Sequence, residues 1–192
     1  MDAKMFCFQC QEAAKGTGCT IKGVCGKDDE TANRMDLLLF VTKGRFVVDA
    51  LFSTITNANF DIESITGRIV NGLKFREQLK EEATGYGIEL PVIDELVWKG
   101  DESTFEGKAL TVGVLREANP DIRSLKELII YGLKGMAAYV EHAGNLGFEE
   151  KDLHAFIQHA LAETLRKDLS AEQLTALVLE TGSYGVKAMA LL

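Results

Sequence analysis

The sequence has few prolines and no long apolar run. Its 192 residues include only two prolines, a composition that suits long helices better than a loop-rich fold. No apolar run approaches the ~20 residues that a membrane-spanning helix needs, and the mean hydropathy is +0.02. We also find no phosphate-binding loop, dinucleotide fingerprint or Ser/His/Asp constellation. These absences argue against a membrane partner and against the common nucleotide-dependent and hydrolytic enzymes.

Positive charge is also scarce. The chain has 21 Lys and Arg residues against 29 Asp and Glu, a net charge of −8, which argues against nucleic acid or an anionic membrane as a partner. The first six residues reach Cys7 without forming a hydrophobic stretch, so we expect no secretory signal. We therefore expect a cytoplasmic protein.

Cysteine is confined to one short segment. The four cysteines are Cys7, Cys10, Cys19 and Cys25, and none follows. A disulfide framework would distribute its bridges over the fold, so the crowding indicates one shared metal-ligand set. In the spacing C-x2-C-x8-C-x5-C, the first pair can hold two corners of one site from a single tight loop. Spacing alone leaves an iron–sulfur cluster, structural zinc and free or redox-active thiols open.

The residues around these cysteines suit such a site. Four glycines allow backbone amides to approach the sulfur atoms, three lysines offset thiolate charge, and two aromatic side chains flank Cys7. They are Gly16, Gly18, Gly23 and Gly26; Lys15, Lys22 and Lys27; and Phe6 and Phe8.

Capping signals divide the remainder into helices, and we expect an all-α fold. Asp61 predicts the start of a helix that runs to about Ala83, and Pro120 fits the first turn of another. A further helix is expected over about 149–166, and Ser170 begins a capping box for the last one. The predicted organisation is a cysteine-rich loop at 1–27, a first helical lobe at 28–85, a connector with a short helix or strand at 86–119, and a second lobe at 120–192.

An internal repeat relates the two lobes. Residues 36–44 line up with 127–135, and 46–51 line up with 156–161, which predicts two related bundles of about three helices each. The first copy is shortened near 44–45 and lacks the turn of the second copy. We therefore expect one long or kinked helix over about 31–56. Such a helix would not fold back on its own lobe, so a domain-swapped homodimer is one possible assembly.

Other conspicuous residues have simpler interpretations. His142, His154 and His159 do not share one helix face at metal-ligand spacing, so we assign them packing or surface roles. The apolar run that contains Leu37 and Leu38 is expected in the core.

Six sequence motifs are distinctive in combination. They are MFCFQCQE at 5–12, GCT at 18–20, GVCGK at 23–27, TAN at 31–33, LFSTITNANFD at 51–61 and YGLKGMAAY at 131–139. Together they closely resemble the hybrid cluster (prismane) protein family, the hydroxylamine reductases. The resemblance covers nearly the whole chain and is most specific in the cysteine block.

The resemblance implies two three-helix bundles and a cubane cluster on Cys7, Cys10, Cys19 and Cys25. The compact spacing is similar to that of the [4Fe–4S] members, with [2Fe–2S] or zinc as alternatives. The family continues into two α/β domains that hold the hybrid cluster, and the ligands of that cluster have no counterpart here.

We therefore expect an electron-transfer domain that is not catalytic alone. The resemblance implies reduction of hydroxylamine to ammonia, or of nitric oxide, as the reaction of the parent enzyme. The implied partners are a redox protein or the further domains. The alternative is a zinc-stabilised or metal-free helical interaction module.

Overall fold

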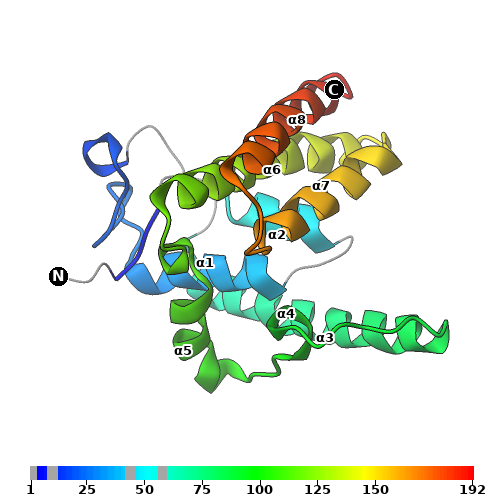
Figure 1. Ribbon diagram of the computed structural model, residues 1–192, viewed down its shortest axis with the longest axis horizontal. Coiled ribbons are helices and arrows are strands. Elements are labelled where there is room, and N and C mark those ends of the chain that lie inside the picture. Colours follow the sequence, from blue (N-terminus) through cyan, green and yellow to red (C-terminus); the bar gives the residue numbers. More distant parts are fainter. Residues whose placement is uncertain (1–3, 8–12, 42–45, 56–59) are drawn as a thin grey trace.

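The computed structural model describes residues 4–7, 13–41, 46–55 and 60–192 (Figure 1). These residues form eight α-helices, two short 3-10 helices and no strand beyond one isolated bridge. The all-α prediction is confirmed. The helices are α1 (Asp29–Val41), α2 (Phe46–Ser53), α3 (Ile62–Gly85), α4 (Asp94–Val97), α5 (Glu102–Val112), α6 (Pro120–Asn145), α7 (Lys151–Thr164) and α8 (Ala171–Met189); η1 is Ala14–Gly16 and η2 is Val114–Arg116.

Three long helices begin at the predicted caps. Asp61 accepts hydrogen bonds from the backbone amides of Glu63 and Ser64 at the start of α3. Asn119 caps α6, which has Pro120 in its first turn. Ser170 and Gln173 form the reciprocal capping box of α8. Each cap satisfies amides that have no partner within the helix.

Two large buried clusters form most of the interior, and a third, small one lies at the cysteine loop. The larger one joins α2, α6, α7 and α8, and the smaller one joins α1, α3 and α5 with Ala50 of α2. Figure 1 shows the same grouping, with α6, α7 and α8 above α1, α3 and α5. Leu37 and Leu38 are buried as expected. At the contact between α6 and α8, a Cβ at Gly132 would lie 2.8 Å from Thr181 Cγ2, so the absence of a side chain permits this close approach.

The prediction of one long or kinked helix over about 31–56 depends on residues 42–45, which lie outside the described part of the chain. The described residues on either side form two helices, α1 and α2. α2 packs beside α6 (Figure 1), where Val47, Val48 and Leu51 enter the larger cluster. Burial of these three side chains favours that position, because it removes apolar surface from water. The oligomeric state, which we inferred from that helix, stays a prediction.

The segment predicted as a connector contains α4, α5 and η2. The sequence predicted a short helix or strand in this connector. Residues 109–115, which belong to it, end α5 and begin η2. Phe105 and Ala109 of α5 pack in the smaller cluster with α1. The buried Arg76 of α3 donates to the carbonyl oxygens of Glu95 (2.9 Å) and Trp98, which fastens this segment to α3.

No helix in the described ranges is long and apolar enough to cross a membrane.

Candidate metal centre

Two of the four predicted ligands lie opposite each other on the backbone. Cys7 N–H donates to Cys19 O at 3.0 Å, and Cys19 N–H donates to Cys7 O at 2.8 Å. Residues directly opposite in an antiparallel pair project their side chains to the same face. The thiols of Cys7 and Cys19 are therefore presented together although 11 residues separate them in the sequence.

The Cys19 sulfur has a backbone partner. Ala14, in η1, directs its N–H at Cys19 Sγ with a distance of 3.4 Å. Cys19 is buried in a small cluster with Met5, Ala13 and Ala32. Hydrogen bonds from amides to sulfur and shielding from water are the features that tune cysteine-bound iron–sulfur clusters. This sulfur environment fits a metal-bound thiolate.

Glycine conformation shapes both ends of the loop. Gly18 has φ +110°, and a Cβ there would lie 2.6 Å from the ring of Phe6. Phe6 therefore packs on the backbone of Gly18, next to Cys19. A Cβ at Gly23 would lie 3.1 Å from Cys25 Sγ and 3.2 Å from the Lys27 carbonyl, so only glycine lets the backbone approach that sulfur freely.

The structure describes three of the four predicted ligands and pairs two of them, Cys7 and Cys19. Cys10 and Phe8 lie outside the described residues, and Cys25 is exposed. Within the ranges that the structure describes, no group of three or more His, Cys, Asp or Glu side chains is arranged to hold a metal ion. The observed arrangement is a Cys7–Cys19 pair with a protected sulfur, and the complete four-cysteine set stays a prediction.

A buried group of charges lies beside the cysteine loop. Its members are Lys27, before α1; Asp36, on α1; and Glu127 and Lys134, on α6. Lys27 and Lys134 are 3% and 2% exposed. Lys134 Nζ lies 3.4 Å from the carbonyl oxygen of Thr54, which can accept its hydrogen bond. The two lysines are buried and the two carboxylates, Asp36 and Glu127, are half-buried; we call these four residues the buried charge cluster.

Burial perturbs the proton affinities in the buried charge cluster. Desolvation, and next the Glu127 carboxylate, raise the pKa of Asp36 to about 7, against the opposing effects of Lys134 and Lys27. Desolvation also raises the pKa of Glu127. It lowers the pKa of Lys134 to about 8, although Glu127, Asp36 and Cys7 oppose that shift. Burial therefore moves the pKa values of Asp36 and Lys134 toward neutral pH from opposite sides.

Sequence reasoning missed Asp36, Glu127 and Lys134 as functional candidates. Each lies within an apolar run. Such a run predicts a buried helix face, but it does not show whether a charged side chain within the run is buried or exposed. One signal was present. Asp36 and Glu127 occupy equivalent positions of the internal repeat, at the first residues of 36–44 and 127–135. The repeat therefore supplies one acid from each copy to the same cluster.

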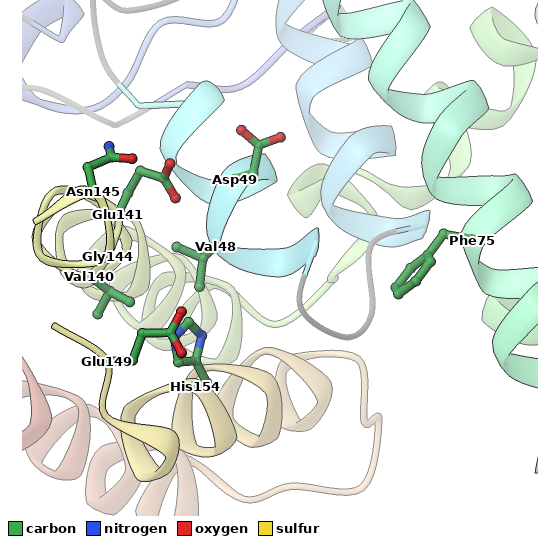
Figure 2. A pocket seen from close by; sticks show the side chains of 9 residues that line it. All are labelled: Val48, Asp49, Phe75, Val140, Glu141, Gly144, Asn145, Glu149 and His154. Atoms are coloured by element: carbon green, nitrogen blue, oxygen red, sulfur yellow. The ribbon is translucent and has the colours of Figure 1, made fainter. Parts of the chain in front are cut away.

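A separate cavity of about 520 Å³ has no cysteine in its lining. Figure 2 shows Glu149 and His154 close together on one side and Phe75, from α3, on the other. The remaining lining residues are Val48, Asp49, Val140, Glu141, Gly144 and Asn145. His142 instead packs edge-on against Phe52, with ring centroids 5.6 Å apart. The cavity is thus distinct from the cysteine loop.

Comparison with known proteins identifies close relatives. The chain is 54% identical to a hydroxylamine reductase of Bacteroides fragilis, an alignment that covers 97% of this chain and 37% of the relative. It is 51% identical to a hydroxylamine reductase of Desulfitobacterium hafniense, over 98% of this chain and 38% of the relative. It is 48% identical to a hydroxylamine reductase of Porphyromonas gingivalis, over 100% of this chain and 39% of the relative. The chain thus spans well under half the length of these relatives.

The relatives are also longer within the matched region. The alignment with the Bacteroides fragilis protein extends over 205 positions, whereas this chain has 192 residues. The Prismane/CO dehydrogenase family matches residues 5–192. The chain belongs to the Prismane/CO dehydrogenase family.

Proposed function

We propose that this chain is the iron–sulfur electron-transfer part of a protein that reduces hydroxylamine to ammonia, or reduces nitric oxide. Cys7, Cys10, Cys19 and Cys25 hold a [4Fe–4S] cluster in this proposal. Such a cluster supplies one-electron redox chemistry when bound. The family and the hydroxylamine reductase relatives support the parent reaction, and a reducing compartment such as the cytoplasm suits the free thiols.

The observation that carries the proposal is the environment of Cys19. Backbone pairing with Cys7 presents two sulfurs on one face, and the Ala14 amide points at one of them. Burial among Met5, Ala13 and Ala32 keeps water from that sulfur. A surface thiol needs neither feature, whereas a cluster ligand benefits from both.

The roles of this chain's residues follow from that environment. The Ala14 N–H stabilises negative charge on Cys19 Sγ and so favours the reduced state of a bound centre. Lys27 and Lys134 add buried positive charge near the same loop. The chain would exchange its electron with a redox partner protein or with the further domains of the parent protein.

Metal analysis tests the proposal directly. Protein purified without oxygen is expected to contain about four iron and four acid-labile sulfide per chain, with a brown chromophore that dithionite bleaches. Cys19→Ser should lose most of that iron. Thr20→Ala, which changes an exposed neighbour of the same loop, should retain it.

The competing function makes a different prediction. Zinc near one per chain, with a colourless protein, would refute the proposal in favour of a zinc-stabilised helical scaffold. Retention of all iron in Cys19→Ser would refute the assigned ligand set.

A further inference from the structure

Cys7 and Cys19 form a single antiparallel bridge. Their two backbone hydrogen bonds, of 3.0 Å and 2.8 Å, run in opposite directions between the same two residues. A pair that exchanges both hydrogen bonds in this way has its Cα atoms about 5.5 Å apart. Most disulfides join Cα atoms that lie about 4.4–6.8 Å apart. The backbone of this pair therefore already has the spacing of a disulfide.

Both side chains also meet in the small buried cluster at the cysteine loop. Cys19 is 4% exposed in this cluster, and the half-buried Cys7 packs against it. The Ala14 N–H, 3.4 Å from Cys19 Sγ, helps to hold that sulfur in place. Side-chain packing and backbone pairing thus bring the same two thiols together.

The other cysteines are not placed in this way by the described residues. Cys25 lies in a turn that is closed by the hydrogen bond from Gly26 N–H to Gly23 O, of 2.9 Å, and its side chain is exposed. Cys10 lies outside the described residues. Among the three cysteines that the structure describes, Cys7 and Cys19 are the pair that shares a bridge and a buried cluster.

We propose that Cys7 and Cys19 form a reversible disulfide when the chain holds no metal, with a small-molecule disulfide such as glutathione disulfide as the oxidant. The more accessible Cys7 thiolate attacks glutathione disulfide first, and one glutathione thiolate leaves. The Cys19 thiolate then attacks the Cys7 sulfur and releases the second glutathione thiolate. The two protein thiols lose two protons and two electrons, one S–S bond forms between them, and one glutathione disulfide becomes two glutathione thiols.

The bond is readily reversed because the pair must shift slightly to form it. Cβ atoms of directly opposite residues lie about 4.5–5.5 Å apart, at the wider end in a hydrogen-bonded pair, whereas a disulfide needs about 3.5–4.5 Å. The bridge is isolated, so the backbone can move by up to about 1 Å without disturbing a longer ladder of hydrogen bonds. Disulfides that depart from relaxed geometry are more easily reduced.

The disulfide and a bound metal exclude each other. A sulfur that binds a metal must be a thiolate, so the oxidised pair cannot be part of a metal site until it is reduced. Meanwhile the disulfide protects both sulfurs from irreversible oxidation to sulfinic and sulfonic acids. Reduction returns two thiols that already lie opposite each other. These consequences are the same for iron–sulfur and for zinc, so the inference does not depend on the proposed function.

The test compares two variants of the full chain after metal has been removed with a chelator. Cys10→Ser/Cys25→Ser keeps Cys7 and Cys19, and Cys7→Ser/Cys10→Ser keeps Cys19 and Cys25. Each variant is equilibrated with mixtures of reduced and oxidised glutathione, and mass spectrometry measures the fraction that has formed its internal disulfide.

The fold and the chain length favour opposite variants. We expect the Cys7–Cys19 variant to form its disulfide at least about tenfold more readily, because the fold already aligns its two thiols. In concentrated urea the order should reverse, by about threefold, because the loop between Cys19 and Cys25 is about half as long and closes at a lower entropic cost.

Peptide mapping of the unchanged, metal-free protein is a second measurement that needs no variant. Trypsin separates the cysteines into the peptides 5–15, 16–22 and 23–27, and fragmentation of the linked pair distinguishes Cys7 from Cys10. We expect glutathione disulfide to link Cys7 to Cys19, and dithiothreitol to restore the thiols.

Three results would overturn the inference. They are thiols that persist in excess glutathione disulfide, a predominant link that joins any other two cysteines, and a Cys7–Cys19 variant that has no advantage in the absence of urea. Iron binding by the reduced protein is measured separately, so failure of the proposed function and failure of this inference are distinguishable.

Discussion

Replacing Lys134 with methionine removes a buried cation while nearly conserving side-chain volume. Lys134 is 2% exposed, and its ammonium group lies 3.4 Å from the Thr54 carbonyl. The change leaves Asp36 and Glu127 buried without their principal cation. Removing one partner of a buried ionic group costs about 3–5 kcal/mol when the remaining charge is uncompensated.

The cost of Lys134→Met depends on pH in a defined direction. Both carboxylates already have a raised pKa, and loss of Lys134 raises each pKa further. A raised pKa in the folded state stabilises the fold at low pH, and that contribution disappears as pH rises through the folded value. Each tenfold increase in the proton affinity of a carboxylate corresponds to about 1.4 kcal/mol.

The loss should therefore be greatest above neutral pH and smallest in mild acid. Near pH 5.5 Asp36, with its pKa raised to about 7, is mostly protonated, and Lys134, with its pKa lowered to about 8, is itself a costly buried cation. We expect a loss of about 3–5 kcal/mol near pH 7.5, and a loss smaller by at least about 1.4 kcal/mol near pH 5.5.

Urea unfolding of the metal-free protein, followed by far-UV circular dichroism at both pH values, measures the difference. Lys74→Met changes an exposed lysine of α3 and should alter the free energy of unfolding by no more than about 0.5 kcal/mol at either pH. An equal loss for Lys134→Met at both pH values would refute the electrostatic reasoning, because a packing defect does not titrate.

Four further outcomes are expected. Leu133→Ala, at a fully buried position of α6, should lower the free energy of unfolding by about 2–5 kcal/mol in urea titrations; a loss under about 1 kcal/mol would contradict the assigned core. Gly23→Ala places a methyl group 3.1 Å from Cys25 Sγ, so iron retained after desalting should fall while the circular dichroism spectrum is preserved. Full retention of iron would show that the loop adapts. Ser170→Ala removes the α8 cap and should cost about 1 kcal/mol in the same unfolding assay, whereas Ser170→Asp should cost less. Removal of metal with a chelator should leave the helical spectrum intact, because the two large buried clusters contain no residue of the cysteine loop; collapse of the spectrum would make the metal a folding determinant.

Helix starts were predictable because their signals are local. Asp61 and Ser170 cap α3 and α8 as expected, since a cap needs only a short polar side chain within three residues of the amides. The position of α2 beside α6 was not predictable in this way. It depends on the packing of Val47, Val48 and Leu51 in the larger cluster, and such tertiary packing overrides local propensity.

The candidate site was predictable in its ligand types but not in its pairing. Cysteine spacing indicated a shared ligand set, yet nothing in it indicated that Cys7 and Cys19 lie opposite each other. Asp36 and Lys134 were missed because helix periodicity describes which faces are apolar, whereas the proximity of these two residues depends on the tertiary arrangement of the helices.

The fastening of residues 94–98 to α3 has a consequence for sequence divergence. Arg76 and Lys80 bind the main-chain carbonyls of Glu95, Trp98 and Leu96 rather than their side chains. Every amino acid offers the same carbonyl group. Substitutions at 95 and 96 can therefore accumulate without changing the path of the chain. Arg76 and Lys80, in contrast, must be kept, because their side chains make the hydrogen bonds that hold this segment. Relatives should diverge most in this segment while tracing it along the same course.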